Sequence, residues 1–504
     1  MTSVVVFVGV DIGTSSVKAV AFNAAGVVLA MSSETLNPTV SPNGMREMDS
    51  IDLWDCTKNA LRKLADTDNI GARMSAISVS SFGEAFVAMD REGRELGPVM
   101  IFTDHRGEED YYAAMARTSD AEIARVCGLP PSITYSVSKL LYLKNHQRDL
   151  YDRSKCFLLV GGYILYKLCG EMAVDYSLAS RTMLFNIHEN AWSEKLLDCF
   201  GIDQSKLPGA FRAGRILGKI RHDLAQELHI SAKAQLVLGG HDQPVCAFAT
   251  GLDEARAVNS LGTSQCITPL MRAPLLPETT LAKFYPSEPF VTEGRYCALA
   301  YNVSSGLLID WFLKTFSPGA QKPFTEYESR APQGPTKLFV LPYLAGSGTP
   351  YMDHKAGFCV AGADPSTTRY DIYKACLEGL CMDMRLNVAE LRRENLAFSK
   401  LVAVGGGSRS EFWLQIIADI LQMPVETLEC SEACALGAAM LGAAALKAYP
   451  SAEAASLSMT RTKHQFTPQK MFMEYYDDKF ALYMKLHASL KPFNDFSNRI
   501  AHPQ

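Results

Sequence analysis

One pattern occurs once in each half of the chain: an apolar run, the tripeptide Gly-Thr-Ser and a second apolar run. In the first copy the runs occupy residues 4–10 and 17–22 and the turn lies at 13–15; in the second copy residues 257–261 precede a turn at 262–264. Apolar runs rich in β-branched residues around so short a polar turn predict two antiparallel strands. Recurrence of this unit in both halves indicates two related domains.

The length of the chain supports the same division, because a single hydrophobic core stops growing well before 504 residues. Residues 27–30 extend the first strand pair to an antiparallel meander, and residues 50–64 predict a helix with Ser50 as its cap. Strands and helices alternate after that. We predict an α/β fold with one domain at residues 1–253 and a second at residues 254–504.

Composition excludes several classes of partner. A net charge of −5 gives no strong field for nucleic acid or for an anionic membrane, and the longest apolar run, residues 435–446, is too short to span a bilayer. The thirteen cysteines form no CxxC pair, which favours free thiols in a reducing cytoplasm over zinc ligands. Residues 462–468 predict a linker before a C-terminal tail.

The turn that follows the first strand has the chemistry of a phosphate site. Gly13 would let the backbone approach a ligand closely, and successive amides with the hydroxyls of Thr14 and Ser15 could surround phosphate oxygens. Asp11 at the end of the strand could hold Mg²⁺ through water. A plain hairpin turn explains the same residues, but the second turn at 262–264 favours a pair that grips a polyphosphate from both sides.

The common nucleotide-binding motifs are missing from the sequence. It has no P-loop, and the stretch Gly405-Gly406-Gly407-Ser408 does not match the dinucleotide fingerprint GxGxxG. Glycines directly after a strand would let a flat base or a ribose lie against the backbone. On these residues alone, an ordinary turn between a strand and a helix is the better interpretation.

A third glycine-rich turn, at residues 239–243, brings a carboxylate to the start of a predicted helix. Phosphoryl transfer to an alcohol needs a group that orients the hydroxyl and accepts its proton, and Asp242 suits that role. The alternative is that Asp242 only caps the helix, and local sequence does not choose between the two. We expect His241 to support its neighbours rather than to act as a base.

Seven motifs, in their order along the chain, carry a resemblance. The sequence resembles the FGGY family of carbohydrate kinases, in the actin–hexokinase–chaperone superfamily, over about residues 4–450. Each motif is unspecific by itself, but the ordered set is specific. The motifs are DIGTSSVK at 11–18, GGHDQ at 239–243, NSLGTS at 259–264, LPYLAGSGTP at 341–350, KACLEGL at 374–380, GGGSRSEFW at 405–413 and ALGAAMLGA at 435–443.

The resemblance implies two ribonuclease-H-like, actin-like ATPase domains on either side of a deep catalytic cleft. The first would bind the sugar and the second ATP. Asp242 would be the catalytic base, with Gln243 beside it on the sugar, and Asp11 and Asp242 would serve Mg²⁺. The residues implied in ATP binding are Gly13, Thr14, Ser15, Lys18, Gly262, Thr263, Gly306, Gly405, Gly406, Gly407 and Ser408.

The predicted sugar site departs from the best-known members of the family. After the strand at 74–80, xylulose kinases usually carry Met-His and glycerol kinases Arg-Glu, whereas this chain has Gly83-Glu84. Glu84 matches the acid of glycerol kinases, but the arginine is missing. We expect Gly83, Glu84 and Phe102 to contact the sugar, Glu84 by accepting hydroxyls and Phe102 by packing on its C–H face. A structural salt bridge is the alternative for Glu84, and core packing is the alternative for Phe102.

The sequence therefore predicts a kinase that uses ATP and Mg²⁺ to phosphorylate a small sugar, first of all a ketopentose such as xylulose or ribulose. Glu84 motivates one alternative, a kinase of polyols such as glycerol or erythritol. A non-catalytic, sugar-sensing ATPase is the other, and the presence of both Asp11 and Asp242 disfavours it. The expected partners are the sugar and ATP, without nucleic acid or membrane, and the resemblance permits a homodimer.

Overall fold

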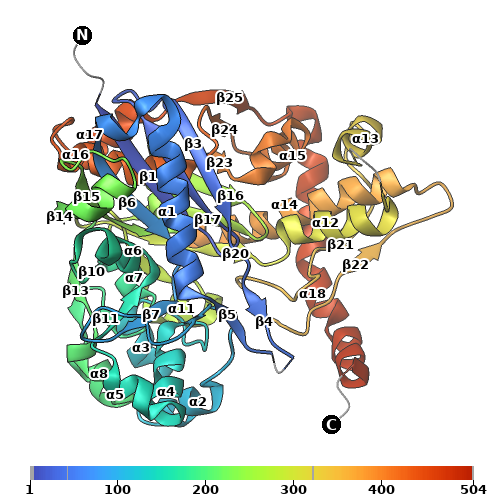
Figure 1. The fold of residues 1–504 in the computed structure, drawn as a ribbon. Helices are drawn as coiled ribbons and strands as arrows, with labels where there is room; N and C mark the ends of the chain where they lie inside the picture. Colours follow the sequence, from blue (N-terminus) through green and yellow to red (C-terminus); the bar gives the residue numbers. More distant parts are fainter. Residues whose placement is uncertain (1–4, 43, 252, 320–322, 502–504) are drawn as a thin grey trace.

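The first half of the chain builds a six-stranded sheet with the strand order β14-β15-β6-β1-β2-β3 (Figure 1). The computed structural model describes residues 5–42, 44–251, 253–319 and 323–501. Strands β1, β2 and β3 form the predicted antiparallel meander, and β6 and β15 run parallel to β1. The bounds are β1 (Val6–Ile12), β2 (Ser16–Phe22), β3 (Val28–Thr35), β6 (Met74–Ser81), β14 (Ile216–Lys219) and β15 (Gln235–His241).

Both faces of this sheet are covered, which is why β1 reads as a continuous apolar run. Alternate residues of a strand face opposite sides. Val6, Val8 and Val10 join the core under α1 (Ser50–Asp66) and α6 (Val160–Cys169), whereas Phe7 joins the core that contains α16.

Helix α16 (Ala433–Ala445) lies late in the chain, yet it packs against β1 and β6 of the first sheet. A Cβ added to Gly9 would lie 1.7 Å from the carbonyl oxygen of Ala435, and one added to Gly437 would lie 2.1 Å from that of Val245. Small residues on both sides allow this close approach. The apolar run at 435–446 is therefore a buried helix of the core. Among the residues that the structure describes, no helix combines the length and the apolarity needed to cross a membrane.

The second half repeats the arrangement around a second sheet, with the order β18-β19-β17-β16-β23-β24-β25 and β20 paired to β17. Strands β16 and β17 form an antiparallel hairpin around the second Gly-Thr-Ser turn, as predicted, and β23 and β24 follow in parallel. The bounds are β16 (Arg256–Leu261), β17 (Gln265–Met271), β18 (Ser287–Pro289), β19 (Tyr296–Ala298), β20 (Ala300–Asn302), β23 (Lys400–Val404), β24 (Val425–Leu428) and β25 (Thr462–Phe466).

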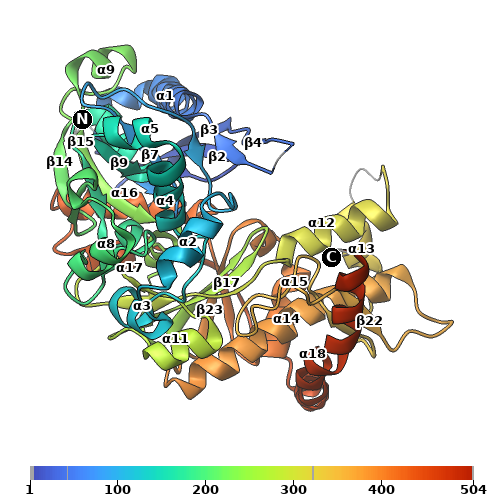
Figure 2. The ribbon, with the colours of Figure 1, turned by 90° about the horizontal axis from the view of Figure 1, so that it is seen from below.

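Long helices surround the second sheet, and Figure 2 shows α12, α14 and α18 gathered on the side of the molecule away from α1. The longest of the buried ones, α14, begins at a capping box in which Thr368 and Asp371 satisfy each other's backbone N–H groups. The helices are α12 (Ser305–Phe316), α14 (Arg369–Arg393), α15 (Glu411–Leu421) and α18 (Met473–Ala501).

Additional elements lie between β6 and β14. One of them, the short helix α7, matters for the site, and so does α10, which follows β15 directly. Besides α6, the elements are β7 (Phe86–Met89), β8 (Val99–Met100), α2 (Glu108–Met115), α3 (Asp120–Cys127), α4 (Ser136–His146), α5 (Arg148–Arg153), β9 (Cys156–Leu159), β10 (Ala173–Asp175), α7 (Tyr176–Ser180), β11 (Phe185–Asn186), β12 (Ala191–Trp192), α8 (Glu194–Phe200) and β13 (Gly209–Phe211), with α10 (Asp242–Phe248) beyond β15.

Two local predictions were wrong. The cap of α1 is Asp49, whose carboxylate accepts from the backbone N–H of Ile51 at 2.7 Å, while Ser50 is the first helical residue. The predicted linker at 462–468 contains β25, the edge strand that pairs with β24.

Of the strand predicted at 4–10, residue 4 lies outside the described residues. A domain division at 253/254 stays a prediction, and the core of the first sheet includes α16 from beyond it.

Candidate active site

The carboxyl ends of three neighbouring parallel strands bring the main candidate residues together. In the register of the sheet, Asp11 lies opposite Ser80 of β6, and Gly240 of β15 lies opposite the same Ser80. Ligands of α/β sheets bind where such strand ends meet. Asp11 thus shares one edge of the sheet with the turn after β6, which carries Gly83 and Glu84, and with Asp242 after β15.

Asp11 and Asp242 influence each other electrostatically. Burial, together with the negative charge of Asp242, raises the pKa of Asp11 to about 7, and Lys18 opposes this rise. Burial and a neighbouring negative charge both disfavour the ionised form of a carboxyl group. The pair is therefore suited to a cation or to a proton in transit.

Asp242 is the first residue of α10, and its side chain is 28% exposed. The cap position belongs to His241, and no side-chain hydrogen bond caps this helix. The capping role that was the alternative for Asp242 is therefore absent. Burial raises the pKa of Asp242, while the neighbouring His241 lowers it.

Gly83 and Glu84 form a tight, strained turn after β6. Glu84 has φ of +63°, a conformation that residues other than glycine seldom adopt, and only 6% of its surface is exposed. Nε of Arg181 donates to its carboxylate at 2.6 Å. The salt bridge named as the alternative for Glu84 is thus present, and a sugar contact by the same carboxylate stays a prediction. Strain held in place by surrounding contacts occurs preferentially at functional sites.

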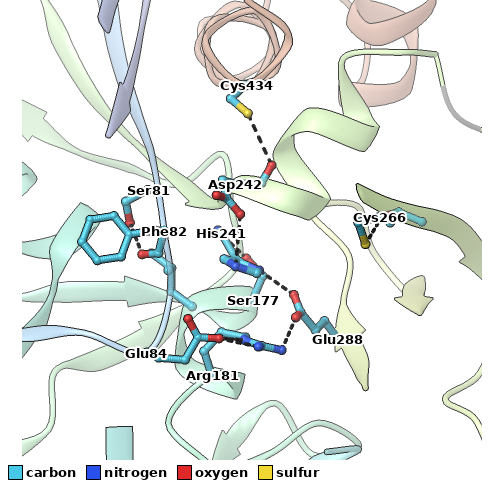
Figure 3. A network of polar contacts seen from close by, with 12 residues as sticks. Ser81, Phe82, Glu84, Ser177, Arg181, His241, Asp242, Cys266, Glu288 and Cys434 are labelled. Carbon is cyan, nitrogen blue, oxygen red and sulfur yellow. Dashed lines mark hydrogen bonds and ion pairs between the residues drawn. The ribbon is translucent and has the colours of Figure 1, made fainter. Parts of the chain in front are cut away.

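A chain of alternating charges joins Glu84 to Asp242 (Figure 3). Arg181 also donates through Nη1 to Glu288, Nδ1 of His241 lies 2.8 Å from the other oxygen of Glu288, and Nε2 of His241 lies 3.2 Å from Oδ1 of Asp242. Burial alone would lower the pKa of His241, but the charges of Glu288 and Asp242 raise it to about 9. The two carboxylates therefore favour the protonated form of His241.

Sequence reasoning missed Arg181 and Glu288, and neither lies in a motif that could have revealed it. Helix α7 explains the position of Arg181, which is the residue at its C-terminal cap. Asp175 caps the other end of α7 by accepting from the N–H of Ser177 at 2.7 Å. The hydroxyl of Ser177 in turn accepts from the N–H of His241 at 2.9 Å. The short helix α7 thus positions both Arg181 and His241.

The residues implied in ATP binding in the second half surround the turn at 262–264. The N–H of Gly306 donates to the carbonyl of Gly262 at 3.1 Å, so α12 begins directly on this turn. Gly405 has φ of +86°, and a Cβ there would lie 2.9 Å from the carbonyl oxygen of Leu261. Thr263 is exposed on the turn. The turn at 262–264, the start of α12 and the beginning of the glycine stretch therefore lie against one another.

Within that glycine stretch, Gly406 borders open space. A Cβ on Gly406 would meet no atom within 4 Å, whereas one on Gly407 would lie 2.8 Å from the side chain of Leu261. Ser408 donates to the carbonyl of Gly405 at 2.7 Å and lines a cavity of about 280 Å³ between β23, β24 and β25. An adenosine group could reach the backbone here. Binding of adenosine by residues 405–408 stays a prediction.

In the first half, the predicted phosphate turn is partly exposed. Gly13 closes it by donating to the carbonyl of Ser16 at 2.9 Å, and Thr14 and Ser15 are accessible. Lys18 on β2 pairs with Glu432 at 2.6 Å, the residue that precedes α16. The amine of Lys18 therefore links the two halves beside the site.

Phe102 and Gln243 are the remaining predicted sugar contacts. Phe102 lies in the turn after β8 with 37% of its surface exposed, which speaks against the core-packing alternative. Asp104, two residues on, is buried and accepts from Nε of Arg106 at 2.9 Å. Gln243 follows Asp242 in the first turn of α10 and is partly exposed. Contact of either residue with a sugar stays a prediction.

Comparison with known proteins gives the same picture over the whole chain. The N-terminal domain of the FGGY family of carbohydrate kinases matches residues 6–249, and its C-terminal domain matches residues 257–446. The chain is 25% identical to the xylulose kinase of Bacillus subtilis over 493 residues, 97% of each chain. It is 28% identical to the glycerol kinase of Aquifex aeolicus over 448 residues, 86% of this chain and 88% of that one.

The fold is shared with solved structures as well. The structure of xylulose kinase from Rhodospirillum rubrum superimposes with a TM-score of 0.88 at 24% identity, covering 97% of this chain and 100% of the other. The predicted resemblance and the two-domain, actin-like ATPase fold are confirmed. The chain therefore belongs to the FGGY family of carbohydrate kinases and is an enzyme that transfers a phosphoryl group from ATP to a hydroxyl group of a small sugar.

Proposed function

We propose that the sugar is a ketopentose such as xylulose or ribulose and that Asp242 is the catalytic base. One observation carries the role of Asp242: its carboxylate is partly exposed beside Asp11 and does not cap α10. Relatives named xylulose kinases match nearly the whole chain, and they support the choice of sugar.

In this mechanism the sugar lies against Glu84, Asp242 and Gln243. Asp242 orients the attacking hydroxyl and accepts its proton as the bond to phosphorus forms. The backbone amides and hydroxyls of the two Gly-Thr-Ser turns, at 13–15 and 262–264, stabilise the charge on the transferring phosphoryl group. The glycine stretch from Gly405 to Ser408 holds the adenosine.

The site fits a magnesium ion. Asp11 and Asp242 offer hard carboxylate oxygens, and burial, followed by the negative charge of Asp242, raises the pKa of Asp11. Among the described residues, no group of three or more His, Cys, Asp or Glu side chains is arranged to hold a metal. Mg²⁺ keeps several waters and binds through one or two carboxylates together with substrate phosphates, and Asp11 and Asp242 could supply these carboxylates. When bound, it would neutralise phosphate charge, with Asp11 as its main protein partner.

Glu84 favours a second candidate, a polyol kinase of the glycerol or erythritol type. The glycerol kinase of Aquifex aeolicus is among the relatives, at 28% identity. A sensing ATPase without transfer is disfavoured, because Asp11 and Asp242 are both retained at the sheet edge.

The test is ADP release from Mg-ATP across a panel of ketoses, aldoses, polyols and sugar acids. We expect a strong response to xylulose or ribulose. Asp242→Asn should retain ATP binding but lose at least about 100-fold in kcat. A response to glycerol or erythritol alone would replace the ketopentose by a polyol, and near-normal kcat in Asp242→Asn would remove that residue from the role of base. Slow hydrolysis that ignores every sugar would favour the sensor.

We also propose a cytoplasmic location for the protein, and we leave a homodimer as its possible oligomeric state to be tested. All thirteen cysteines are free thiols in the structure, which supports a reducing compartment such as the cytoplasm. A homodimer is permitted by the family, and light scattering of the purified protein would decide its oligomeric state.

A further inference from the structure

Glu288 is the centre of the charged chain that ends in Glu84 and Asp242. Its side chain is fully buried, and its two oxygens are divided between two cations: Oε1 accepts from Arg181 and Oε2 pairs with His241 at 2.8 Å. Arg181 then donates to Glu84, and His241 pairs with Asp242. Glu288 is therefore connected to each predicted sugar-contacting carboxylate through a single side chain, that of Arg181 or of His241 (Figure 3).

Glu288 reaches this site from the other half of the chain. It lies on β18 of the second sheet, whereas Glu84, Arg181 and His241 belong to the first half. It is separated from Arg181 by 107 residues and from His241 by 47. The contact thus ties the predicted sugar site to the half that carries the predicted ATP site.

We propose that Glu288 is a positioning residue that holds Glu84 through Arg181 and Asp242 through His241. This inference rests on the proposed roles of Glu84 and Asp242. Burial of charged groups costs free energy unless each is paired and hydrogen-bonded. In the series from Glu84 to Asp242 each side chain contacts its neighbour directly, so removal of the central carboxylate leaves Arg181 and His241 without the partner that they share.

The surroundings of Arg181 are shaped for this arrangement. Its guanidinium lies over the ring of Tyr135 at 5.0 Å. A Cβ on Gly83 would lie 2.9 Å from Cγ of Arg181 and 3.2 Å from Cδ2 of His241. The glycine therefore leaves room for both cations. The strained backbone of Glu84 is held where Arg181 binds its carboxylate.

The two branches of the chain predict different kinetic effects. The Arg181 branch ends at Glu84, so its loss should raise the KM for sugar. The His241 branch ends at Asp242, so its loss should lower kcat. Loss of Glu288 should do both, by roughly 10-fold or more in each constant, because small misplacements of reacting groups have large effects on rate. The KM for ATP should not change.

The experiment compares Glu288→Gln with a matched control, Glu378→Gln. Glu378 is also fully buried in the second half and pairs with Lys479 at 2.6 Å, but it belongs to neither predicted site. Both variants lose one buried carboxylate charge at constant size. We expect both to lower the unfolding temperature, and only Glu288→Gln to change the KM for sugar and kcat on the sugar found with the panel.

If Glu288→Gln does not fold, two further variants test the branches separately. Arg181→Lys keeps a positive charge but cannot reach two carboxylates in the same way, and it should mainly raise the KM for sugar. His241→Gln keeps a polar side chain and should mainly lower kcat. Equal effects of both on all constants, or on none, would overturn the proposal.

The Asp242→Asn variant separates failure of this inference from failure of the proposed function. If Asp242→Asn is inactive and Glu288→Gln has unchanged constants, Glu288 is only structural and the base survives. If Asp242→Asn turns over normally, the proposed base is wrong, whatever Glu288→Gln does.

Discussion

A side chain at residue 83 and the side chain of Arg181 would occupy the same space. A Cβ on Gly83 would lie 2.9 Å from Cγ of Arg181, closer than such atoms approach in proteins. Arg181 in turn donates to the carboxylate of Glu84, the next residue along the chain. The glycine and the distant arginine thus act as a pair, and Arg181, at the end of α7, brings a guanidinium group to Glu84.

The first prediction concerns this pair. Gly83→Ala should push Arg181 away from Glu84 and raise the KM for sugar about 10-fold, at a cost of about 1–3 kcal/mol in the free energy of unfolding. Steady-state kinetics with sugar varied at saturating ATP measures the effect. Gly334→Ala is the control, because a Cβ there would meet its nearest atom at an ordinary 3.8 Å. An unchanged KM for sugar in Gly83→Ala would show that the position of Arg181 does not matter for sugar binding.

The second prediction concerns the turn at 262–264. A Cβ on Gly306 would lie 2.6 Å from the carbonyl oxygen of Gly262, which already accepts from the N–H of Gly306. Gly306→Ala should therefore displace the turn and raise the KM for ATP about 10-fold while the KM for sugar stays the same, since overpacking of this kind costs about 1–3 kcal/mol. The opposite pattern is expected for Gly83→Ala, so each variant serves as the control of the other. A rise in the KM for sugar alone would contradict the placement of ATP at this turn.

Much of the fold could be predicted, because its strongest signals are local. The two strand–turn–strand units need only apolar runs around a short polar turn, and both occur as predicted. Asp242 could be singled out because a glycine turn precedes it. Whether it caps the helix was open, since a cap is decided by backbone geometry that the residue type does not determine. The same limit explains α1, where Asp49 and Ser50 are both good caps and the structure uses Asp49.

What could not be predicted depends on contacts between distant segments. Arg181 reaches Glu84 over 97 residues, and Glu288 reaches His241 over 47, with no periodicity to connect them. Strand β25 was mistaken for a linker because most of its residues are exposed, so it lacks the apolar alternation by which strands are recognised. Its place at the edge of the sheet, paired on one side with β24, explains that exposure.

The third prediction is a pH dependence of stability that arises from Asp383 in α14. Burial raises the pKa of Asp383 to about 6, although Tyr343, Asn302 and Tyr483 oppose the rise by donating to it. Because the carboxyl of an unfolded aspartate titrates near 3.8, the folded state binds this proton more tightly than the unfolded state. The contribution of protonated Asp383 to the free energy of unfolding is therefore fully present below about pH 4 and is lost as the pH rises through about 6.

Asp383→Asn removes this titration and keeps the size of the side chain. The unfolding temperature of the variant, measured by calorimetry from pH 4.5 to 7.5, should rise relative to that of the unmodified protein as the pH increases. Other titrating groups cancel in this difference, because they are common to both proteins. A difference that stays constant over the whole range would mean that Asp383 binds its proton equally in the folded and unfolded states, and that the three donors compensate its burial completely.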